Sequence, residues 1–367
     1  MNPVRILHMI GSMNIGGSQT MILNLYRAID REKVQFDFVL DHHEERALAS
    51  QFEALGARIY SVPTFTGKNI NQVLQAWNTF FEEHPEYKIL HSHVRSYASL
   101  YLPIARKHGL KTIIHSHSTS NGSGIKALVK KTLQYPLRYL ADYYFSCSEE
   151  AGRWLFGSKT VTSEKHYVVR NAIDARAYRY DPLVREQYIA QLGLTGKYVY
   201  AHVGRFHPAK NHEFLLRVFK KISEKNPDAH LMLVGDGDLR SEIETQIAQL
   251  ALTDRVLLLG NRHDISGVLQ AADCFLFPSK WEGLGIVAVE AQAAGLPCIC
   301  SDQVPRLVHV MPSCQFLALE EELWVQAALQ ASRERTDAYE QIVGAGYDVF
   351  TTAEWLYAFY QELWTEV

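Results

Sequence analysis

Short apolar runs rich in β-branched and aromatic residues alternate with amphipathic segments along nearly all of the 367-residue chain. These runs predict strands at residues 4–10, 36–40, 57–62, 89–93, 112–115, 143–147, 167–169, 198–203, 230–234, 255–259, 274–278 and 297–300. Between them, segments such as 213–224 and 239–252 carry apolar residues at helical spacing. Regular strand–helix alternation is typical of parallel, doubly wound sheets. The sequence therefore predicts an α/β protein.

This series of strands is too long for a single doubly wound sheet, so we expect two Rossmann-like domains. The polar stretch 174–197 is the natural break, because a new strand opens at Tyr198. We place the first domain at residues 1–180 and the second at 181–346. Five scattered cysteines without a CxxC pair predict neither a disulfide framework nor a zinc site. The N-terminal segment predicts a strand rather than a signal peptide, and no apolar run is long enough to span a membrane, so we expect a cytoplasmic protein.

The net charge of -3 hides a difference between the two halves of the chain. Residues 1–180 hold 22 Lys and Arg against 15 Asp and Glu, a charge of +7. Residues 181–367 hold 15 against 25, a charge of -10. A basic half suggests an anionic partner. Nucleic acid, an anionic membrane surface and a phosphorylated substrate all fit this charge.

Three features of the first half follow predicted strands. A glycine-rich turn from Gly11 to Ser18 contains Gly16 and Gly17 and leads into a helix from about Gln19, an arrangement that lets backbone amides approach an anion. The alternative is a tight turn without a ligand. Two His-Ser-His triplets, at 91–93 and 115–117, end two further strands, where ligands of open α/β sheets bind. They predict a polar wall of the site in preference to a metal site.

In the second half, the turn Gly204–Asn211 carries Arg205 and Lys210 and suits a diphosphate, because arginine offers a planar fork and lysine a point charge. Turns at Gly235 and at Gly260–Arg262 end two further strands of the same predicted edge. The segment 277–291 contains two carboxylates eight residues apart, Glu282 in a loop and Glu290 on a helix, with Gly283, Leu284 and Gly285 between them. These two acids can hold two different parts of one ligand.

Together these segments resemble retaining glycosyltransferases of family 4, of the bacterial capsular and exopolysaccharide type. The resemblance covers nearly the whole chain and is carried by the double glycine at 16–17, VVRNAID at 168–174, GRFHPAKN at 204–211, VGDGDLR at 234–240 and E-x7-E at 282 and 290. It implies a GT-B fold, in which two Rossmann-like domains face a cleft, and a C-terminal helix, residues 347–367 here, that returns to the first domain. The chain departs from the family at Ser18-Gln19, where Ala-Glu is common.

The resemblance also implies roles for residues. Arg205 and Lys210 hold the donor diphosphate, and Glu290 holds the ribose. Glu282 holds the donor sugar together with the backbone of Gly283, Leu284 and Gly285. His117 lies near the anomeric carbon, with His115 as the second choice. The remaining substrate-binding residues of this prediction are Gly16, Gly17, Gly235 and Arg262.

We therefore expect a metal-independent enzyme that needs no cofactor and moves a hexose or N-acetylhexosamine from a UDP-sugar to a glycan or to a polyprenyl-diphosphate-linked acceptor in surface polysaccharide biosynthesis. We expect no nucleic-acid partner.

The basic stretch 124–139, with Lys126, Lys130 and Lys131 among apolar residues, suggests docking on the inner face of the cell membrane, although a helix packed on its own domain would look similar. A sugar-nucleotide 2-epimerase is the alternative enzyme. The absence of GxGxxG argues against a nicotinamide dehydrogenase, and the retained Arg205, Lys210, Glu282 and Glu290 argue against a non-enzymatic subunit.

Overall fold

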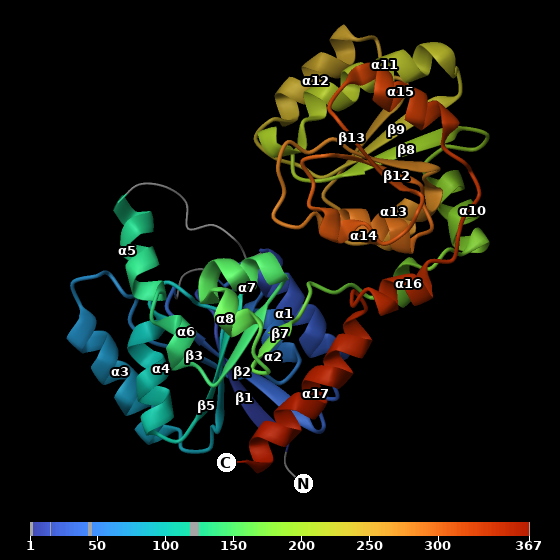
Figure 1. The fold of residues 1–367 in the computed structure, drawn as a ribbon. Coiled ribbons are helices and arrows are strands. Elements are labelled where there is room, and N and C mark those ends of the chain that lie inside the picture. Colours follow the sequence, from blue (N-terminus) through green and yellow to red (C-terminus); the bar gives the residue numbers. More distant parts are fainter. Residues whose placement is uncertain (1–2, 15, 43–45, 118–124, 367) are drawn as a thin grey trace. The chain divides into compact units, whose positions relative to one another are not determined.

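The computed structural model describes residues 3–14, 16–42, 46–117 and 125–366, with the side chains of 125–129 left out. The chain divides into two compact units, Met1–Ile173 with Asp348–Val367, and Asp174–Tyr347. Each unit is built on one parallel sheet with helices on both faces (Figure 1). The predicted α/β class and the two doubly wound sheets are confirmed.

The sheet of the first unit has the strand order β3-β2-β1-β4-β5-β6-β7, and every pair is parallel. The order reverses beside β1, because β2 and β3 lie on one side of it and β4 to β7 on the other. The strands are β1 (Val4–Met9), β2 (Val34–Leu40), β3 (Ile59–Ser61), β4 (Ile89–Ser92), β5 (Lys111–Ser116), β6 (Tyr143–Ser146) and β7 (His166–Val168).

Alternate residues of these strands supply two separate cores. Ile6 packs in the core that contains α1, α2 and α17, whereas the next residue, Leu7, packs in the core of α3, α4, α6 and α7. This follows from the two-residue period of a strand. The helices are α1 (Gly17–Ala28), α2 (Ala49–Ala54), α3 (Ile70–Glu83), α4 (Ala98–Lys107), α5 (Ile125–Gln134), α6 (Leu137–Leu140), α7 (Glu149–Phe156), α8 (Ser158–Val161) and α17 (Val349–Thr365).

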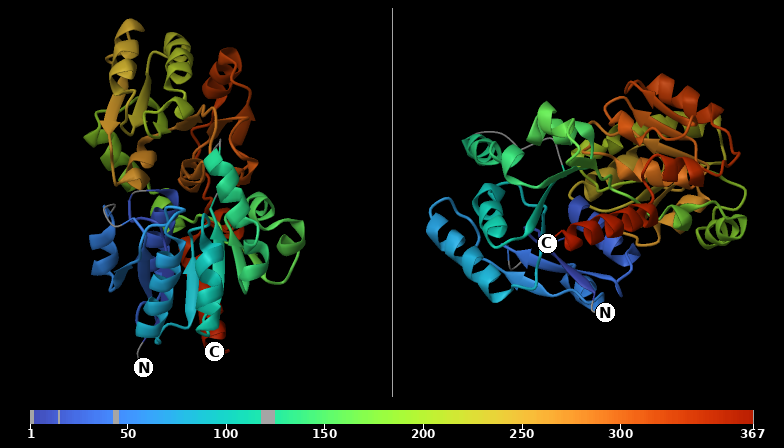
Figure 2. Two further views of the ribbon diagram at one scale, coloured as in Figure 1. Left: turned by 90° about the vertical axis from the view of Figure 1, so that its left-hand side faces the viewer. Right: turned by 60° about the horizontal axis from the view of Figure 1, so that its bottom comes forward.

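Helix α17 belongs to the first unit although it ends the chain. Its buried residues, among them Ala353, Leu356, Tyr360 and Leu363, recur at helical spacing and form one apolar stripe. That stripe packs against α1, β1 and β4. In Figure 2 the red C-terminal helix lies beside the blue N-terminal one. Where the chain returns to this unit, the Val349 amide donates a hydrogen bond of 2.8 Å to the Ile173 carbonyl.

The second unit has a six-stranded sheet in the order β10-β9-β8-β11-β12-β13, again all parallel. Helices α11, α12 and α15 cover one face, and α13 and α14 lie on the other (Figure 1). The strands are β8 (Tyr198–Val203), β9 (Ala229–Val234), β10 (Val256–Gly260), β11 (Cys274–Phe277), β12 (Cys298–Ser301) and β13 (Cys314–Leu317). The helices are α9 (Ala175–Tyr178), α10 (Pro182–Gln191), α11 (His212–Lys225), α12 (Arg240–Gln249), α13 (Ile265–Ala271), α14 (Ile286–Ala293), α15 (Glu321–Gln330) and α16 (Tyr339–Gly344).

The structure differs from the sequence-based expectation in three places. The units divide at Ile173 and Asp174 rather than at 180, because α9 packs on α13 and α14. Strand β13 was not predicted; it is a four-residue strand at the edge of the sheet with one buried residue. Helix α1 begins at Gly17 rather than near Gln19. All the predicted strands are present, with ends that shift by one or two residues. In the described part of the chain, no helix is both long and apolar enough to cross a bilayer.

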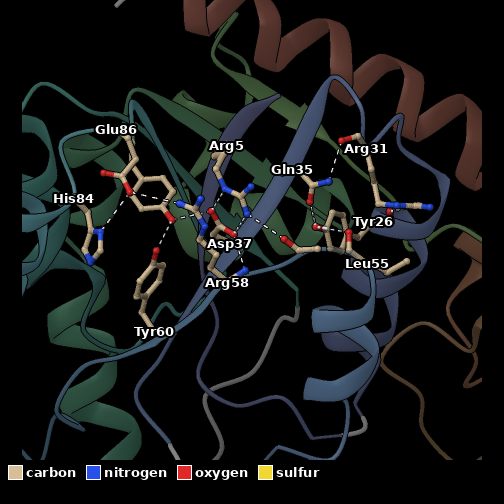
Figure 3. A network of polar contacts seen from close by, with 12 residues as sticks. Arg5, Tyr26, Arg31, Gln35, Asp37, Leu55, Arg58, Tyr60, His84 and Glu86 are labelled. Atoms are coloured by element: carbon tan, nitrogen blue, oxygen red, sulfur yellow. Dashed lines mark hydrogen bonds and ion pairs between the residues drawn. The ribbon is translucent and has the colours of Figure 1, made fainter. Parts of the chain in front are cut away.

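A buried carboxylate ties strands β1 and β2 to the loops near their amino ends (Figure 3). Asp37 is fully buried, and both of its oxygens accept hydrogen bonds from the Arg5 guanidinium at 2.5 Å. It also accepts from the Arg58 amide at 2.7 Å and from the Tyr87 hydroxyl at 2.7 Å. The buried charge of Asp37 is therefore fully paired. The cluster joins β1 to β2 at the edge of the sheet opposite the candidate site.

We expect Asp37→Asn to lower the free energy of unfolding by about 3–5 kcal/mol, because it leaves the Arg5 guanidinium without its paired charge. Urea denaturation measures the change. The matched control is Asp30→Asn, which breaks an exposed pair with Lys33 and should change stability little. Equal effects of the two substitutions would contradict this role of Asp37.

Candidate active site

The predicted site residues cluster at the carboxyl ends of the strands in both units. Ligands of open parallel sheets bind at this edge, beside the point where the strand order reverses. In the first unit that point lies between β1 and β4, and in the second unit between β8 and β11. The turns after β8 and β11 carry Lys210 and Glu282, and the ends of β1 and β4 carry His8 and His93.

In the second unit, Lys210 and Glu282 form an ion pair across the reversal point. The Lys210 Nζ lies 2.5 Å from the Glu282 Oε1, and their side chains are only 18% and 11% exposed. The same ammonium lies 4.9 Å from the centre of the Phe277 ring. A partly desolvated lysine on an aromatic face gains cation–π attraction as well as charge pairing. The sequence pattern therefore named two residues that the fold places in contact.

Backbone contacts hold the two turns together. The Asn211 side-chain amide donates to the Pro278 carbonyl at 3.2 Å, and the Lys280 amide donates to the Ala209 carbonyl at 2.7 Å. Asn211 also begins α11 in a left-handed conformation, φ 58°. These bonds fix the backbone of the turn that carries Lys210 relative to the turn that carries Glu282. The Lys210 ammonium is thereby held close to the Glu282 carboxylate.

The loop from Gly283 to Gly285 brings backbone amides to the same region. Gly285 has φ +84° and caps the start of α14, and a side-chain Cβ there would lie 2.9 Å from the Phe277 ring. Gly283 is exposed, with no atom within 4 Å of a Cβ added to it. A helix start with open backbone beside it is suited to bind polar oxygens of a ligand.

Glu290 lies on α14 in a desolvated position. Burial raises the pKa of its carboxyl to about 7, and a hydrogen bond from the Tyr178 hydroxyl partly offsets this rise. Burial, and after it the neighbouring Glu290 carboxylate, raise the pKa of Tyr178. A carboxylate balanced by a hydroxyl rather than by a cation is a strong acceptor for further hydroxyl groups, such as those of a ribose.

The other predicted residues of the second unit are arranged differently. Arg205 is 66% exposed and contacts Asp238 at 3.2 Å, so it is held only by a surface pair. Gly235 has φ +135°, and a Cβ there would lie 2.2 Å from the Gly204 carbonyl, so packing already requires glycine. Arg262 pairs with Asp264, its Nε 2.8 Å from Oδ1, and follows β10, two strands away from β8. For Arg262, substrate binding stays a prediction.

In the first unit, Gly16 and Gly17 form the start of α1. Gly16 is its extended N-cap, and Gly17 has open space around the position of a Cβ. Gln19 closes this turn, because its side-chain amide donates to the Ser12 carbonyl at 3.1 Å. The twelve-residue helix therefore presents its first amides beside the end of β1.

Five histidines form a continuous cluster at the same edge. The two members of each His-Ser-His triplet lie on one face of their strand and stack, with ring centres 4.4 Å apart for 91 and 93 and 4.0 Å for 115 and 117. His8 joins them from β1, a residue that the sequence patterns did not indicate. Both members of each triplet join the cluster, because residues two apart in a strand share a face.

Hydrogen bonds between rings order this cluster. The His93 Nε2 lies 3.0 Å from the His8 Nδ1, and the His93 Nδ1 lies 2.8 Å from the His117 Nε2. His91 bonds the Tyr360 hydroxyl of α17 at 2.6 Å, so the C-terminal helix supports the cluster. Burial holds the pKa of all five imidazoles below its usual value, to about 3 for His8 and His117. The cluster is therefore neutral at physiological pH.

Two histidine triplets in the described part of the chain are close enough to share a metal ion, with their nitrogen atoms within 4.8 Å of one another. They are His8 with His91 and His93, and His93 with His115 and His117. However, the ring planes within these triplets are inclined by 11° to 36° to one another, and both nitrogens of His93, which the two triplets share, already bond other imidazoles. The geometry therefore favours a hydrogen-bonded row over a coordination site.

Two protein-family models match different parts of this chain. The model described as Glycosyltransferase Family 4 matches residues 15–177, and the model described as Glycosyl transferases group 1 matches residues 184–313. A Bacillus subtilis (strain 168) protein named as a glycosyltransferase, EpsF, is 32% identical over 94% of this chain and 93% of its own length. The chain belongs to glycosyltransferase family 4.

Two further comparisons agree with this assignment. An Escherichia coli UDP-Gal:alpha-D-GlcNAc-diphosphoundecaprenol alpha-1,3-galactosyltransferase is 27% identical to this glycosyltransferase over 82% of the chain and 79% of the relative. The crystal structure of Anabaena Alr3699/HepE in complex with UDP has a TM-score of 0.79 at 18% identity and covers 98% of this chain and 100% of that one. This structural likeness shows that the two parallel-sheet units are those of the GT-B fold.

The neutral histidine cluster should make this glycosyltransferase sensitive to acid. Each imidazole has a folded pKa below the value of about 6.5 in the unfolded chain, so unfolding takes up protons as the pH falls below 6.5. Stability is then lost at up to about 1.4 kcal/mol per pH unit for each histidine. His8→Asn keeps a polar atom near the Nδ1 position and removes one titrating group. We expect its stability to fall less steeply from pH 7 to 5 than that of the wild type, measured by calorimetry.

The control is His263→Asn, which removes an exposed histidine of the second unit and should leave the dependence on pH unchanged. If the His8 variant and the wild type lose stability equally between pH 7 and 5, the buried histidines are not the source of the acid sensitivity.

Proposed function

We propose that this glycosyltransferase is a retaining, metal-independent enzyme that transfers a hexose or N-acetylhexosamine from a UDP-sugar to a glycan or lipid-linked acceptor in surface polysaccharide biosynthesis. The Lys210–Glu282 pair beside an open glycine loop carries the proposal. Support for the donor comes from the UDP named in the Alr3699/HepE structure, and support for the acceptor from the diphosphoundecaprenol named for the Escherichia coli relative. Retention of the anomeric configuration rests on the family resemblance.

In this proposal, Lys210 exchanges its partner when the donor binds. Its ammonium leaves the Glu282 carboxylate for the diphosphate, and Glu282 then accepts hydrogen bonds from hydroxyls of the donor sugar. Negative charge grows on the diphosphate as the glycosidic bond breaks. Lys210 and Arg205 stabilise that charge in place of a metal ion, while the backbone of the loop 283–285 holds the donor sugar together with Glu282. Arg205 is available because its pair with Asp238 is exposed and weak.

Glu290, with its elevated pKa, accepts hydrogen bonds from the ribose. For Gly16, Gly17, His115 and His117 we propose the substrate-binding roles that the family resemblance gives them. His117 is a suitable residue next to a reacting carbon, because burial keeps its imidazole uncharged and able both to donate and to accept a hydrogen bond.

We also propose that the first unit docks on an anionic membrane surface through the α5–α6 surface, which consists of Lys130, Lys131, Tyr135, Arg138 and Tyr139. Tyr135 and Tyr139 are 58% and 67% exposed, and the Arg138 guanidinium lies 4.2 Å from the Tyr135 ring centre. Exposed aromatic rings among basic side chains suit a lipid headgroup region. Lys126 and the apolar residues 125, 128 and 129 of the predicted amphipathic face have side chains outside the described part of the structure.

Transfer should proceed in excess EDTA and depend on Lys210. We expect Lys210→Met to lower kcat/KM with the cognate UDP-sugar by roughly 10- to 100-fold, because it removes a charge-assisted contact to the diphosphate. Lys220→Met, on the exposed side of α11, is the matched control and should keep normal activity. A panel of UDP-sugars identifies the donor, and the anomeric configuration of the product tests retention.

Three outcomes would contradict parts of this proposal. Normal rates for Lys210→Met would remove the diphosphate role. Activity that EDTA abolishes and Mg²⁺ or Mn²⁺ restores would replace the metal-independent mechanism. An epimerised nucleotide sugar formed without an acceptor would indicate a 2-epimerase instead of a transferase.

The docking surface is tested by sedimentation with liposomes at low salt. We expect the wild type to bind vesicles with anionic lipid and not neutral ones, and Lys131→Glu with Tyr139→Ser to bind at least five-fold less, because attraction and apolar contact are both reduced. Lys220→Glu, the same charge change in the second unit, should bind as the wild type does. Equal sedimentation of the wild type with both kinds of vesicle would contradict electrostatic docking.

A further inference from the structure

The first unit contains a cavity of about 320 Å³ at the carboxyl edge of its sheet. Gly11 after β1, Asp41 after β2, and His93 and Arg95 after β4 form its wall, and Lys130 of α5 closes one side. The cavity therefore lies beside the reversal point between β1 and β4, where ligands of such sheets bind. One lining residue, His93, belongs to the histidine cluster and bonds His117, so only the His93 ring separates the cavity from His117.

Arg95 is a cation built into this wall rather than a surface side chain. Its guanidinium lies 5.3 Å from the Trp154 ring centre and close enough to His117 to help lower the pKa of that imidazole. Burial lowers the pKa of Arg95 itself, and the Cys147 thiol opposes this only in part. A desolvated guanidinium at a cavity wall is stabilised by an anion that enters the cavity, and its planar fork matches two oxygens of a phosphate.

Two more side chains define what kind of anion fits. Lys130, whose side chain is exposed, adds a second positive charge from a different element. Asp41 is buried at 3% exposure and accepts a hydrogen bond from the Tyr97 hydroxyl at 2.8 Å. A fixed carboxylate disfavours phosphate on its own side of the cavity but accepts hydrogen bonds from neutral hydroxyls there. The lining thus combines a phosphate-binding side with a hydroxyl-binding side.

We infer that this cavity binds the acceptor through a sugar-linked phosphate or diphosphate. Arg95 and Lys130 hold the phosphate, and Asp41 holds a hydroxyl of the adjoining sugar. This inference rests on the proposed function, and adds to it the residues that recognise the acceptor. A lipid-linked diphosphate sugar and a soluble sugar phosphate share this chemistry. Because Lys130 also belongs to the α5–α6 surface, a lipid-linked acceptor would reach the cavity from the docked side.

Direct binding tests the phosphate site without catalysis. Inorganic pyrophosphate is titrated by calorimetry into the full chain in saturating UDP, which occupies the donor diphosphate residues. We expect saturable binding by the wild type and at least ten-fold weaker binding by Arg95→Gln and by Lys130→Gln, with Arg95→Lys in between because it keeps the charge but loses the fork. Lys107→Gln, an exposed lysine of α4, should bind as the wild type does.

Absence of pyrophosphate binding to the UDP-saturated wild type would overturn the inference. So would unchanged affinity in both Arg95→Gln and Lys130→Gln. Because Lys130 is exposed, its variant should fold even if the Arg95 variant does not, and circular dichroism identifies any unfolded variant.

Acceptor kinetics give a second, separate readout. We expect Arg95→Gln to raise the KM for a phosphorylated acceptor at least ten-fold relative to the KM for the same sugar without phosphate. Lys131→Glu should affect only the lipid-linked form of that acceptor. An equal rise of KM for both sugars would mean that Arg95 does not recognise phosphate. Acceptor-independent hydrolysis of the nucleotide sugar by the wild type reports on the proposed function alone, so its failure is distinguishable from that of this inference.

Discussion

Parallel pairing of every strand in both sheets is the constraint on which the rest of the structure depends. Parallel strands need crossover connections, so all strands of a sheet end at the same edge and all the connecting turns that follow them gather there. Residues far apart in the sequence, such as Lys210 and Glu282, therefore come into contact. The same pairing separates alternate residues of each strand into two cores, which is why both faces of each sheet are covered by helices.

At this edge the protein keeps polar groups in places that are largely removed from water. The histidine cluster, the Lys210–Glu282 pair and Glu290 are each costly to bury, and each is compensated locally. The histidines remain neutral and bond one another, lysine and carboxylate pair, and Glu290 is balanced by Tyr178. In the proposed mechanism, donor binding exchanges the internal partners of Lys210 and Glu282 for substrate groups, so little water has to be reorganised when charge develops.

Helix α17 links the end of the chain to the site of the first unit. Its apolar stripe provides the packing, and Tyr360 within that stripe bonds His91. A buried tyrosine requires a hydrogen-bond partner, and here the partner is a member of the histidine cluster. Truncation of this helix would therefore expose the core of the first unit and also leave a site histidine without its bond.

The sequence by itself determined the class of the fold and most of its strands, because strand and helix periods are local properties. It also indicated the residue types of the proposed donor site, since Arg205, Lys210, Glu282 and Glu290 stand in short local motifs. Only the tertiary structure decided which of these side chains meet, that His8 and Tyr360 join the two His-Ser-His triplets, and that Arg95, Asp41 and Lys130 line one cavity. It also placed α9 in the second unit. The physical reason is that these contacts join distant segments, and their partners depend on strand order and register, which no local pattern encodes.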